Sequence, residues 1–315
     1  MTSQVRYYLL VLLALFLFAG GCTSDEAHQG EVSEDRNSNR VIAVSFALSE
    51  FTQRIAGDTI QVDFPGSSSD DPKEWSPTVE EVVELQKADV IVINGPGAKY
   101  ANWLTRVTLD ESKFCKTAHN FGLGGYLMIK DYQIVHSHGP EGEHSHPYFV
   151  PYCWLDPKLA VKQGEQILAS LSAIYPDKKK LFEQNLESLK EDLDSLTSSM
   201  SEFATDKKVI CINPLPKFLT RSLGVADSHL LYFSKDDLAS ADEFQNALKT
   251  KQNETEAVAL VTTFELPDEI AKVVKSLGLE VVNIDLIETP NGGSYIQAMK
   301  NNVQKLKDIC QANAD

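Results

Sequence analysis

Four of the seven histidines of the 315-residue chain lie within eleven residues, in the stretch HSHGPEGEHSHP. They are His136, His138, His144 and His146. Imidazole nitrogen is the commonest metal ligand besides thiolate, so this cluster predicts capture of a divalent cation such as Zn²⁺. The intervening glycines and proline predict a mobile loop, and ordering a loop around an ion opposes binding through lost entropy. A polar surface loop whose histidines are incidental is the alternative.

The cysteines are a second group with possible chemistry. Apart from Cys22 there are four, Cys115, Cys153, Cys211 and Cys310. Outside the cytoplasm they would be free to form disulfides, but four thiols allow three full pairings and the sequence does not choose among them. Buried free thiols are the alternative.

The N-terminal segment resembles a bacterial lipoprotein signal. Arg6 precedes the apolar run YYLLVLLALFLF, and AGG leads into Cys22, the residue expected to carry the lipid. Residues 23–40 contain almost no large apolar side chain and predict a disordered tether. We therefore expect an extracytoplasmic protein, lipid-anchored on the periplasmic side of a membrane or at the cell surface. A plain cleavable signal with an incidental cysteine is the alternative.

Composition narrows the class of protein. A formal net charge of -16 and a pI near 4.9 argue against a nucleic-acid partner, because such binding needs clustered Lys and Arg. A hydrophobic content of 43% in 315 residues is enough for two domains. The sequence contains no phosphate-binding glycine loop, nucleophile elbow or metalloprotease helix, so we do not expect an enzyme.

The pattern from Val41 onward predicts two α/β lobes. Short β-branched runs alternate with amphipathic segments over 41–177 and again over 207–315, which is typical of parallel sheets covered by helices. Between them, leucines recur at helical spacing and predict one long helix over 178–206. The segment SPTVEEVVELQKA predicts a helix capped by Ser76, with Val79, Val82, Val83 and Leu85 on one apolar stripe.

Several motifs carry a family resemblance. They are PGSSSDDPKEWSPT, KADVIVINGPGAKYANWL, YCWLDPKLAVKQGEQI, TTFELPDEIAKVVKSLG and IDLIETPNGGSYIQAMKNNVQKLK. In order and spacing, the chain from about 41 to 310 resembles the substrate-binding lipoproteins of zinc and manganese ABC importers, the cluster A-I class. The resemblance implies two α/β lobes joined by one long rigid backbone helix. It also implies that the protein delivers Zn²⁺, or secondarily Mn²⁺, to a membrane permease.

The resemblance further implies a metal site of three histidines and one carboxylate. The three histidine positions are occupied here by Lys73, Tyr152 and Asn213, and Asp285 retains the carboxylate. A protonated lysine has no lone pair to give a metal, so the usual cleft site is altered. We hypothesise that Lys73 pairs with Asp285 and holds the lobes closed without metal.

Two alternatives follow from these substitutions. Cys153 and Cys211, beside two of the altered positions, would serve as soft ligands together with Asp285 and Glu265. Otherwise the chain is a divergent member that has lost cleft metal binding. It would then act as an adhesion or interaction module, or bind a non-metal ligand between Lys73, Tyr152 and Asn213.

Overall fold

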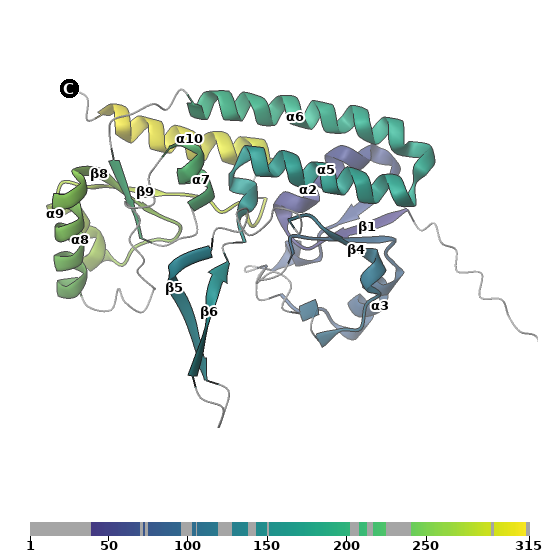
Figure 1. Ribbon diagram of the computed structural model, residues 1–315, viewed down its shortest axis with the longest axis horizontal. Coiled ribbons are helices and arrows are strands. Elements are labelled where there is room, and N and C mark those ends of the chain that lie inside the picture. Colours follow the sequence, from purple (N-terminus) through teal and green to yellow (C-terminus); the bar gives the residue numbers. More distant parts are fainter. Residues whose placement is uncertain are drawn as a thin grey trace, which may run out of the picture. The chain divides into compact units, whose positions relative to one another are not determined.

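The structure is a computed structural model (Figure 1). It describes residues 39–69, 72, 75–95, 103–104, 106–118, 128–137, 143–149, 151–201, 208–212, 217–224, 241–290 and 293–312. The predicted signal peptide and nearly all of the predicted tether lie outside these residues. The first strand begins at Arg40, whose guanidinium pairs with Asp63 and Glu84.

A four-stranded parallel sheet forms the first α/β unit. Its strands are ordered β2-β1-β3-β4, and all pairings are parallel. Every residue of β3 is buried, as expected for a strand covered on both faces. The strands are β1 (Arg40–Ala43), β2 (Gln61–Asp63), β3 (Val90–Ile93) and β4 (Phe114–Lys116), with helices α2 (Phe46–Ala56) and α3 (Val79–Lys87) between them.

Helix α3 begins two residues later than the predicted cap allows. Thr78 accepts a hydrogen bond from the Glu81 N–H through its hydroxyl, and the Glu81 carboxylate accepts one from the Thr78 N–H. This reciprocal capping box satisfies two N–H groups, so the prediction of Ser76 as the cap was wrong. Leu85 is buried as predicted, whereas Val79 is 77% exposed and the predicted stripe is only partly covered.

A three-stranded parallel sheet, ordered β7-β8-β9, forms the second α/β unit. Alternate residues of its strands enter two different apolar clusters: Val209 and Val261 join the main core, whereas Ile210 and Leu260 pack in a second cluster that includes α8 and α9. The sheet is therefore covered on both faces, which confirms the predicted α/β class. The elements are β7 (Lys208–Cys211), α7 (Lys217–Ser222), α8 (Ala241–Thr255), β8 (Ala257–Thr262), α9 (Asp268–Ser276), β9 (Glu280–Asn283) and α10 (Tyr295–Ala312).

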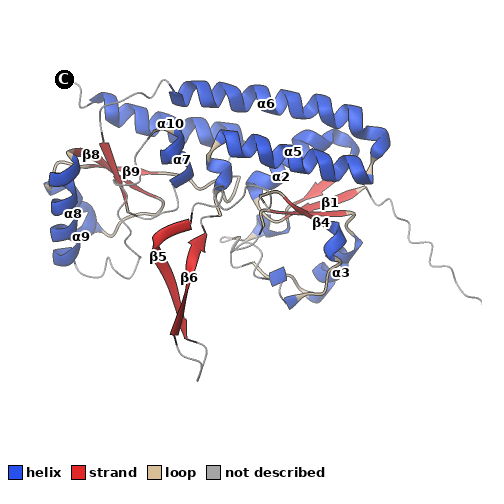
Figure 2. Cartoon of the chain, viewed as in Figure 1, coloured by secondary structure: helices blue, strands red, loops and turns tan. Residues whose placement is uncertain are grey.

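Two long helices, α5 (Pro157–Ile174) and α6 (Lys179–Ser201), lie side by side (Figures 1 and 2). A short 3₁₀ turn at Pro176–Lys178 separates them. Helix α6 buries Leu186, Leu189, Leu193 and Leu196, the periodic leucines of the sequence. This confirms a long helix within 178–206, of which residues 202–206 lie outside the described part of the chain. The lobe boundaries at 41–177 and 207–315 remain predictions.

The segment predicted as a mobile loop is instead built around a β-hairpin. Strand β5 (Met128–Ser137) pairs antiparallel with β6 (Glu143–Phe149), and the register shifts between Ile129 and Gln133. His136, His144 and His146 therefore belong to strands, and the loop prediction was wrong for them. The β-branched and aromatic residues around the histidines favour strand pairing over an open loop, a signal the glycine content had obscured.

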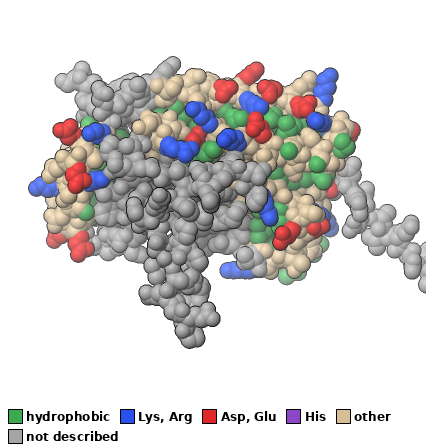
Figure 3. Space-filling view, viewed as in Figure 1, with side chains coloured by type: hydrophobic (Ala, Val, Ile, Leu, Met, Phe, Trp, Pro, Cys, Tyr) green, Lys and Arg blue, Asp and Glu red, His purple; other side chains and the backbone are tan. Residues whose placement is uncertain are grey.

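On the face shown in Figure 3, Lys and Arg side chains are interspersed with Asp and Glu side chains. None of the helices in the described part of the chain combines the length and apolar character needed to cross a membrane.

Candidate functional site

The predicted site residues divide into those the structure describes and those it does not. Lys73, Asn213, His138 and Cys22 lie outside the described residues, so the hypothesised Lys73–Asp285 pair remains a prediction. Tyr152 and Asp285, two of the four family positions, are described and lie in segments that contact each other. These two segments form the candidate site.

The first segment precedes helix α5. Tyr152 is 3% exposed and leads into a 3₁₀ turn at Cys153–Leu155. Asp156 then caps α5, because its Oδ1 accepts the Lys158 N–H at 2.9 Å. Its Oδ2 accepts a hydrogen bond from Arg221 of α7, also at 2.9 Å, so a largely buried carboxylate fixes the start of α5 against the second α/β unit.

The second segment follows strand β9. Asp285 Oδ1 accepts the N–H of Ile287 at 2.7 Å, which closes a tight turn. Ile287 is fully buried and has a φ of 60°, in the left-handed region that β-branched residues rarely adopt. Such a residue stores about 1–2 kcal/mol of strain and persists because its surroundings hold it.

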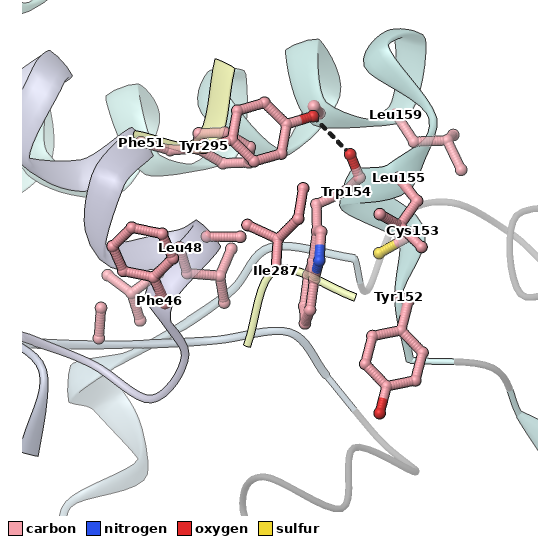
Figure 4. Packing of buried hydrophobic residues seen from close by; sticks show 14 of the residues in the cluster. Phe46, Leu48, Phe51, Tyr152, Cys153, Trp154, Leu155, Leu159, Ile287 and Tyr295 are labelled. Carbon is pink, nitrogen blue, oxygen red and sulfur yellow. Dashed lines mark hydrogen bonds between the residues drawn. The ribbon is translucent and has the colours of Figure 1, made fainter. Parts of the chain in front are cut away.

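Three hydrogen bonds bring the two segments and the start of α10 together. The Tyr152 hydroxyl donates to Glu288 Oε1 at 2.6 Å, and the Trp154 indole N–H donates to the Leu286 carbonyl at 2.9 Å. The Tyr295 hydroxyl donates to the Trp154 carbonyl at 2.5 Å, as the dashed line in Figure 4 marks. The two contacts of Trp154 are buried among the apolar residues of the main core, several of which Figure 4 labels, whereas the Tyr152–Glu288 contact is only partly buried.

Glu288 is a site residue that the sequence reasoning missed. It lies three residues after Asp285 in the segment DLIE, and spacing alone gave no reason to select it. Its proximity to Tyr152 depends on the fold, because the two residues are 136 positions apart.

A pocket of about 390 Å³ lies beside Asp285. Helix α10 supplies most of its lining, including Gln297, Asn301 and Lys305. The Lys305 ammonium also donates to the Asn283 carbonyl at 2.9 Å. Asp285 is therefore one of the residues that line this pocket, whereas Tyr152 and Glu288 are not among them.

The cysteines do not form the alternative thiolate site. Cys115, Cys153 and Cys211 are buried free thiols, and burial raises the pKa of each to about 12. Cys153 donates to the side-chain oxygen of Asn94 at 3.1 Å. Among the described side chains, which include those of Glu265 and Asp285 but not those of the β5–β6 hairpin, no three His, Cys, Asp or Glu residues are grouped so that they could hold a metal ion. The pairing of Cys310 lies outside the described side chains.

The hairpin pairs the two segments that carry the histidines. His136 is the register partner of His144, and His146 is the partner of Ile134. The three histidine positions therefore fall within three consecutive register pairs of the ribbon.

Known proteins resemble the chain over nearly its whole length. It is 28% identical to the zinc-binding lipoprotein AdcA of Streptococcus pneumoniae strain R6, with 97% of this chain and 60% of AdcA covered. It is 26% identical to the high-affinity zinc uptake system protein ZnuA of Bacillus subtilis, with 95% and 96% covered. The chain thus spans about 60% of the length of AdcA.

Solved structures share the fold. The metal-dependent lipoprotein YcdH of Bacillus subtilis has a TM-score of 0.69 at 22% identity, covering 86% of this chain and 98% of that one. The Zn(II)-bound ZnuA-like domain of Streptococcus pneumoniae AdcA has a TM-score of 0.65 at 24% identity, with the same coverage of 86% and 98%.

The family model described as "zinc-uptake complex component A, periplasmic" matches residues 41–309, which include both α/β units, the hairpin and the two segments of the candidate site. The chain therefore belongs to the ZnuA family of zinc-uptake components.

Proposed function

We propose that this chain is the solute-binding component of a divalent-metal ABC importer. Its cargo is Zn²⁺, with Mn²⁺ second. The family match and the zinc-binding and manganese-transport names of relatives such as AdcA and ScaA of Streptococcus gordonii support this proposal. The protein binds and releases an ion and performs no chemistry on it, so it is not an enzyme.

The observation that carries the proposal is the histidine register of the β5–β6 hairpin. His136 and His144 are direct register partners, and His146 is two residues further along β6. Zn²⁺ binds imidazole nitrogen at about 2.0–2.1 Å, and a set of three histidines is one of its known ligand sets. Because pairing already fixes the backbone of both strands, less entropy is lost on binding than for an open loop. The hairpin is therefore a capture site for zinc.

The remaining assignments follow from the family and the N-terminal sequence. Cys22 carries the lipid anchor, and residues 23–40 connect the anchor to the folded part. The protein works as a monomer outside the cytoplasm, on the periplasmic side of a membrane or at the cell surface. Its partner is the membrane permease of the importer, and nucleic acid is not a partner at a net charge of -16.

A second candidate function is favoured by one contact. The Tyr152–Glu288 hydrogen bond joins two segments at a position where the family resemblance implies a histidine ligand. If Lys73 and Asn213 also replace ligands, the cleft no longer binds metal. The chain would then act as an adhesion or interaction module, or take a non-metal ligand.

Zinc titration against a chelator of known affinity tests the first function. The paired change His136→Ala and His144→Ala removes both members of a register pair, and we expect zinc affinity to fall at least tenfold. The matched control is His119→Ala with His229→Ala, which removes two histidines outside the hairpin and is expected to change little. Equal affinity in all three proteins would refute hairpin capture, and absence of zinc binding in the unaltered chain would favour the second function.

A further inference from the structure

Asn302 of helix α10 holds the backbone of Asp285 at two points. Its side-chain oxygen accepts the Asp285 N–H at 2.9 Å, and its side-chain NH₂ donates to the Asp285 carbonyl at 2.8 Å. Asn302 is completely buried. Strand β9 ends at Asn283, so the amide side chain supplies to Asp285 the pair of hydrogen bonds that a neighbouring strand would supply.

Asn94 makes a comparable contact on either side of Tyr152. It follows strand β3 and is 2% exposed. Its side-chain NH₂ donates to the Pro151 carbonyl at 2.5 Å, and its side-chain oxygen accepts from the Cys153 thiol at 3.1 Å. Gln163 of α5 donates to the same oxygen at 2.8 Å, which fixes the orientation of the Asn94 amide.

We propose that Asn94 and Asn302 are positioning residues of the candidate cleft. Asn94 fixes the backbone from which the Tyr152 side chain projects, and Asn302 fixes the backbone that carries the Asp285 carboxylate. Neither asparagine belongs to the predicted ligand set, and each acts through a neighbour. The role of Tyr152 and Asp285 towards cargo rests on the proposed function, whereas the positioning of their backbones does not.

Both positions require an amide because one side chain must donate one hydrogen bond and accept another. Asn302→Asp keeps the acceptor but loses the donor, and sets an anionic oxygen against the Asp285 carbonyl. Asn302→Leu has similar volume and loses both hydrogen bonds. Asn94→Asp keeps the acceptor for Cys153 and Gln163 and loses the bond to Pro151. Partners that orient ligands in this way commonly change metal affinity by about 10–100-fold when they are altered.

Hydrogen exchange of backbone amides tests the positioning without any metal. In Asn302→Leu, we expect exchange of the Asp285 and Ile287 amides to rise at least tenfold. Thr52→Val is the matched control, because Thr52 is fully buried and its hydroxyl donates to Leu48 within α2 at 2.6 Å. The control removes a buried hydrogen bond far along the chain and is expected to leave both amides unchanged. Equal exchange in the two variants would overturn the proposal, and Asn302→Asp replaces Asn302→Leu if the latter does not fold.

Metal titration then separates this proposal from the proposed function. It is performed with zinc and manganese in a chain that carries Lys73→His, Tyr152→His and Asn213→His together with His136→Ala and His144→Ala, so that a cleft with restored imidazoles is measured alone. We expect Asn302→Asp and Asn94→Asp to weaken cleft affinity at least tenfold relative to Thr52→Val. One outcome is that no variant binds an ion in the cleft, although amide exchange at Asp285 still rises in Asn302→Leu. Metal binding in the cleft would then be refuted, and the positioning role of Asn302 would hold. Unchanged exchange together with unchanged affinity would overturn the positioning role.

Discussion

The phenol of Tyr152 and the carboxylate of Glu288 form a 2.6 Å hydrogen bond between two segments that are far apart in the sequence. One segment begins helix α5 and the other follows strand β9. A direct side-chain contact therefore links these two segments. The contact differs from the hypothesised Lys73–Asp285 pair, which would involve the segment around Lys73.

The Tyr152–Glu288 bond is expected to stabilise the fold. Hydrogen bonds to charged groups contribute about 1.5–3 kcal/mol, so Tyr152→Phe should lower the free energy of unfolding by about that amount. A double-mutant cycle with Glu288→Gln, measured by urea unfolding, should give a coupling energy of at least about 1 kcal/mol. Additive effects of the two substitutions would show that the bond contributes nothing. Tyr175→Phe is a matched control, because it removes another phenol–carboxylate hydrogen bond, from Tyr175 to Asp89 at 2.7 Å, and it should not couple to Glu288→Gln.

Restoring the imidazoles implied by the family should restore zinc binding in the cleft. Lys73→His, Tyr152→His and Asn213→His together replace one ammonium, one phenol and one amide by groups with a nitrogen lone pair. In a chain without the hairpin histidines, we expect this triple change to raise zinc affinity at least tenfold. Chelator competition measures the change, and Lys73→His alone is the control. No gain from the triple change would mean that these are not ligand positions.

The capping box of helix α3 gives a prediction for stability. Thr78→Ala removes the hydroxyl that accepts the Glu81 N–H and should lower the free energy of unfolding by about 1 kcal/mol. Ser76→Ala, at the exposed position first predicted as the cap, should change it by less than about 0.5 kcal/mol. Urea unfolding measures both values. A larger loss for Ser76→Ala than for Thr78→Ala would contradict the observed helix start.

Buried thiols predict a loss of stability in alkali. In the folded chain, burial raises the pKa of the Cys115, Cys153 and Cys211 thiols from 9.0 to about 12. Unfolded thiols therefore ionise first, and stability falls as pH rises from 9 towards 12. Each thiol contributes a slope of at most about 1.4 kcal/mol per pH unit. Cys211→Ala should reduce the slope of the free energy of unfolding against pH by up to the contribution of one thiol. Unfolding measured between pH 8 and pH 11 checks this. An unchanged slope would contradict the effect of burial on the thiol pKa.

The sequence predicted the architecture better than the site. Periodic leucines identified α6, and the continuous apolar run of β3 identified a buried parallel strand, because each pattern is local and repeats with the period of its element. The cap of α3 was misplaced by two residues because Ser76 and Thr78 are both acceptable caps. The spacing Thr78-x-x-Glu81 already matches a capping box in the sequence, whereas Ser76 has Val79 at the corresponding position, so this signal was present and was not used.

The site contacts depend on distant pairings that no local pattern reveals. Glu288 approaches Tyr152, and Asn302 approaches Asp285, because α10 and the β9 segment pack beside the start of α5. The hairpin was missed because glycine and proline between His138 and Glu143 suggested a loop, whereas the register of His136 with His144 depends on the pairing of whole strands.

Native mass spectrometry of the purified chain at micromolar zinc tests whether the hairpin histidines capture zinc. If they do, the unaltered chain binds a zinc ion. The ion is lost when residues 136–146 are deleted and is retained when His119 and His229 are changed to Ala. Failure of the unaltered chain to bind zinc, or full retention of the ion after the deletion, would contradict capture by the hairpin histidines.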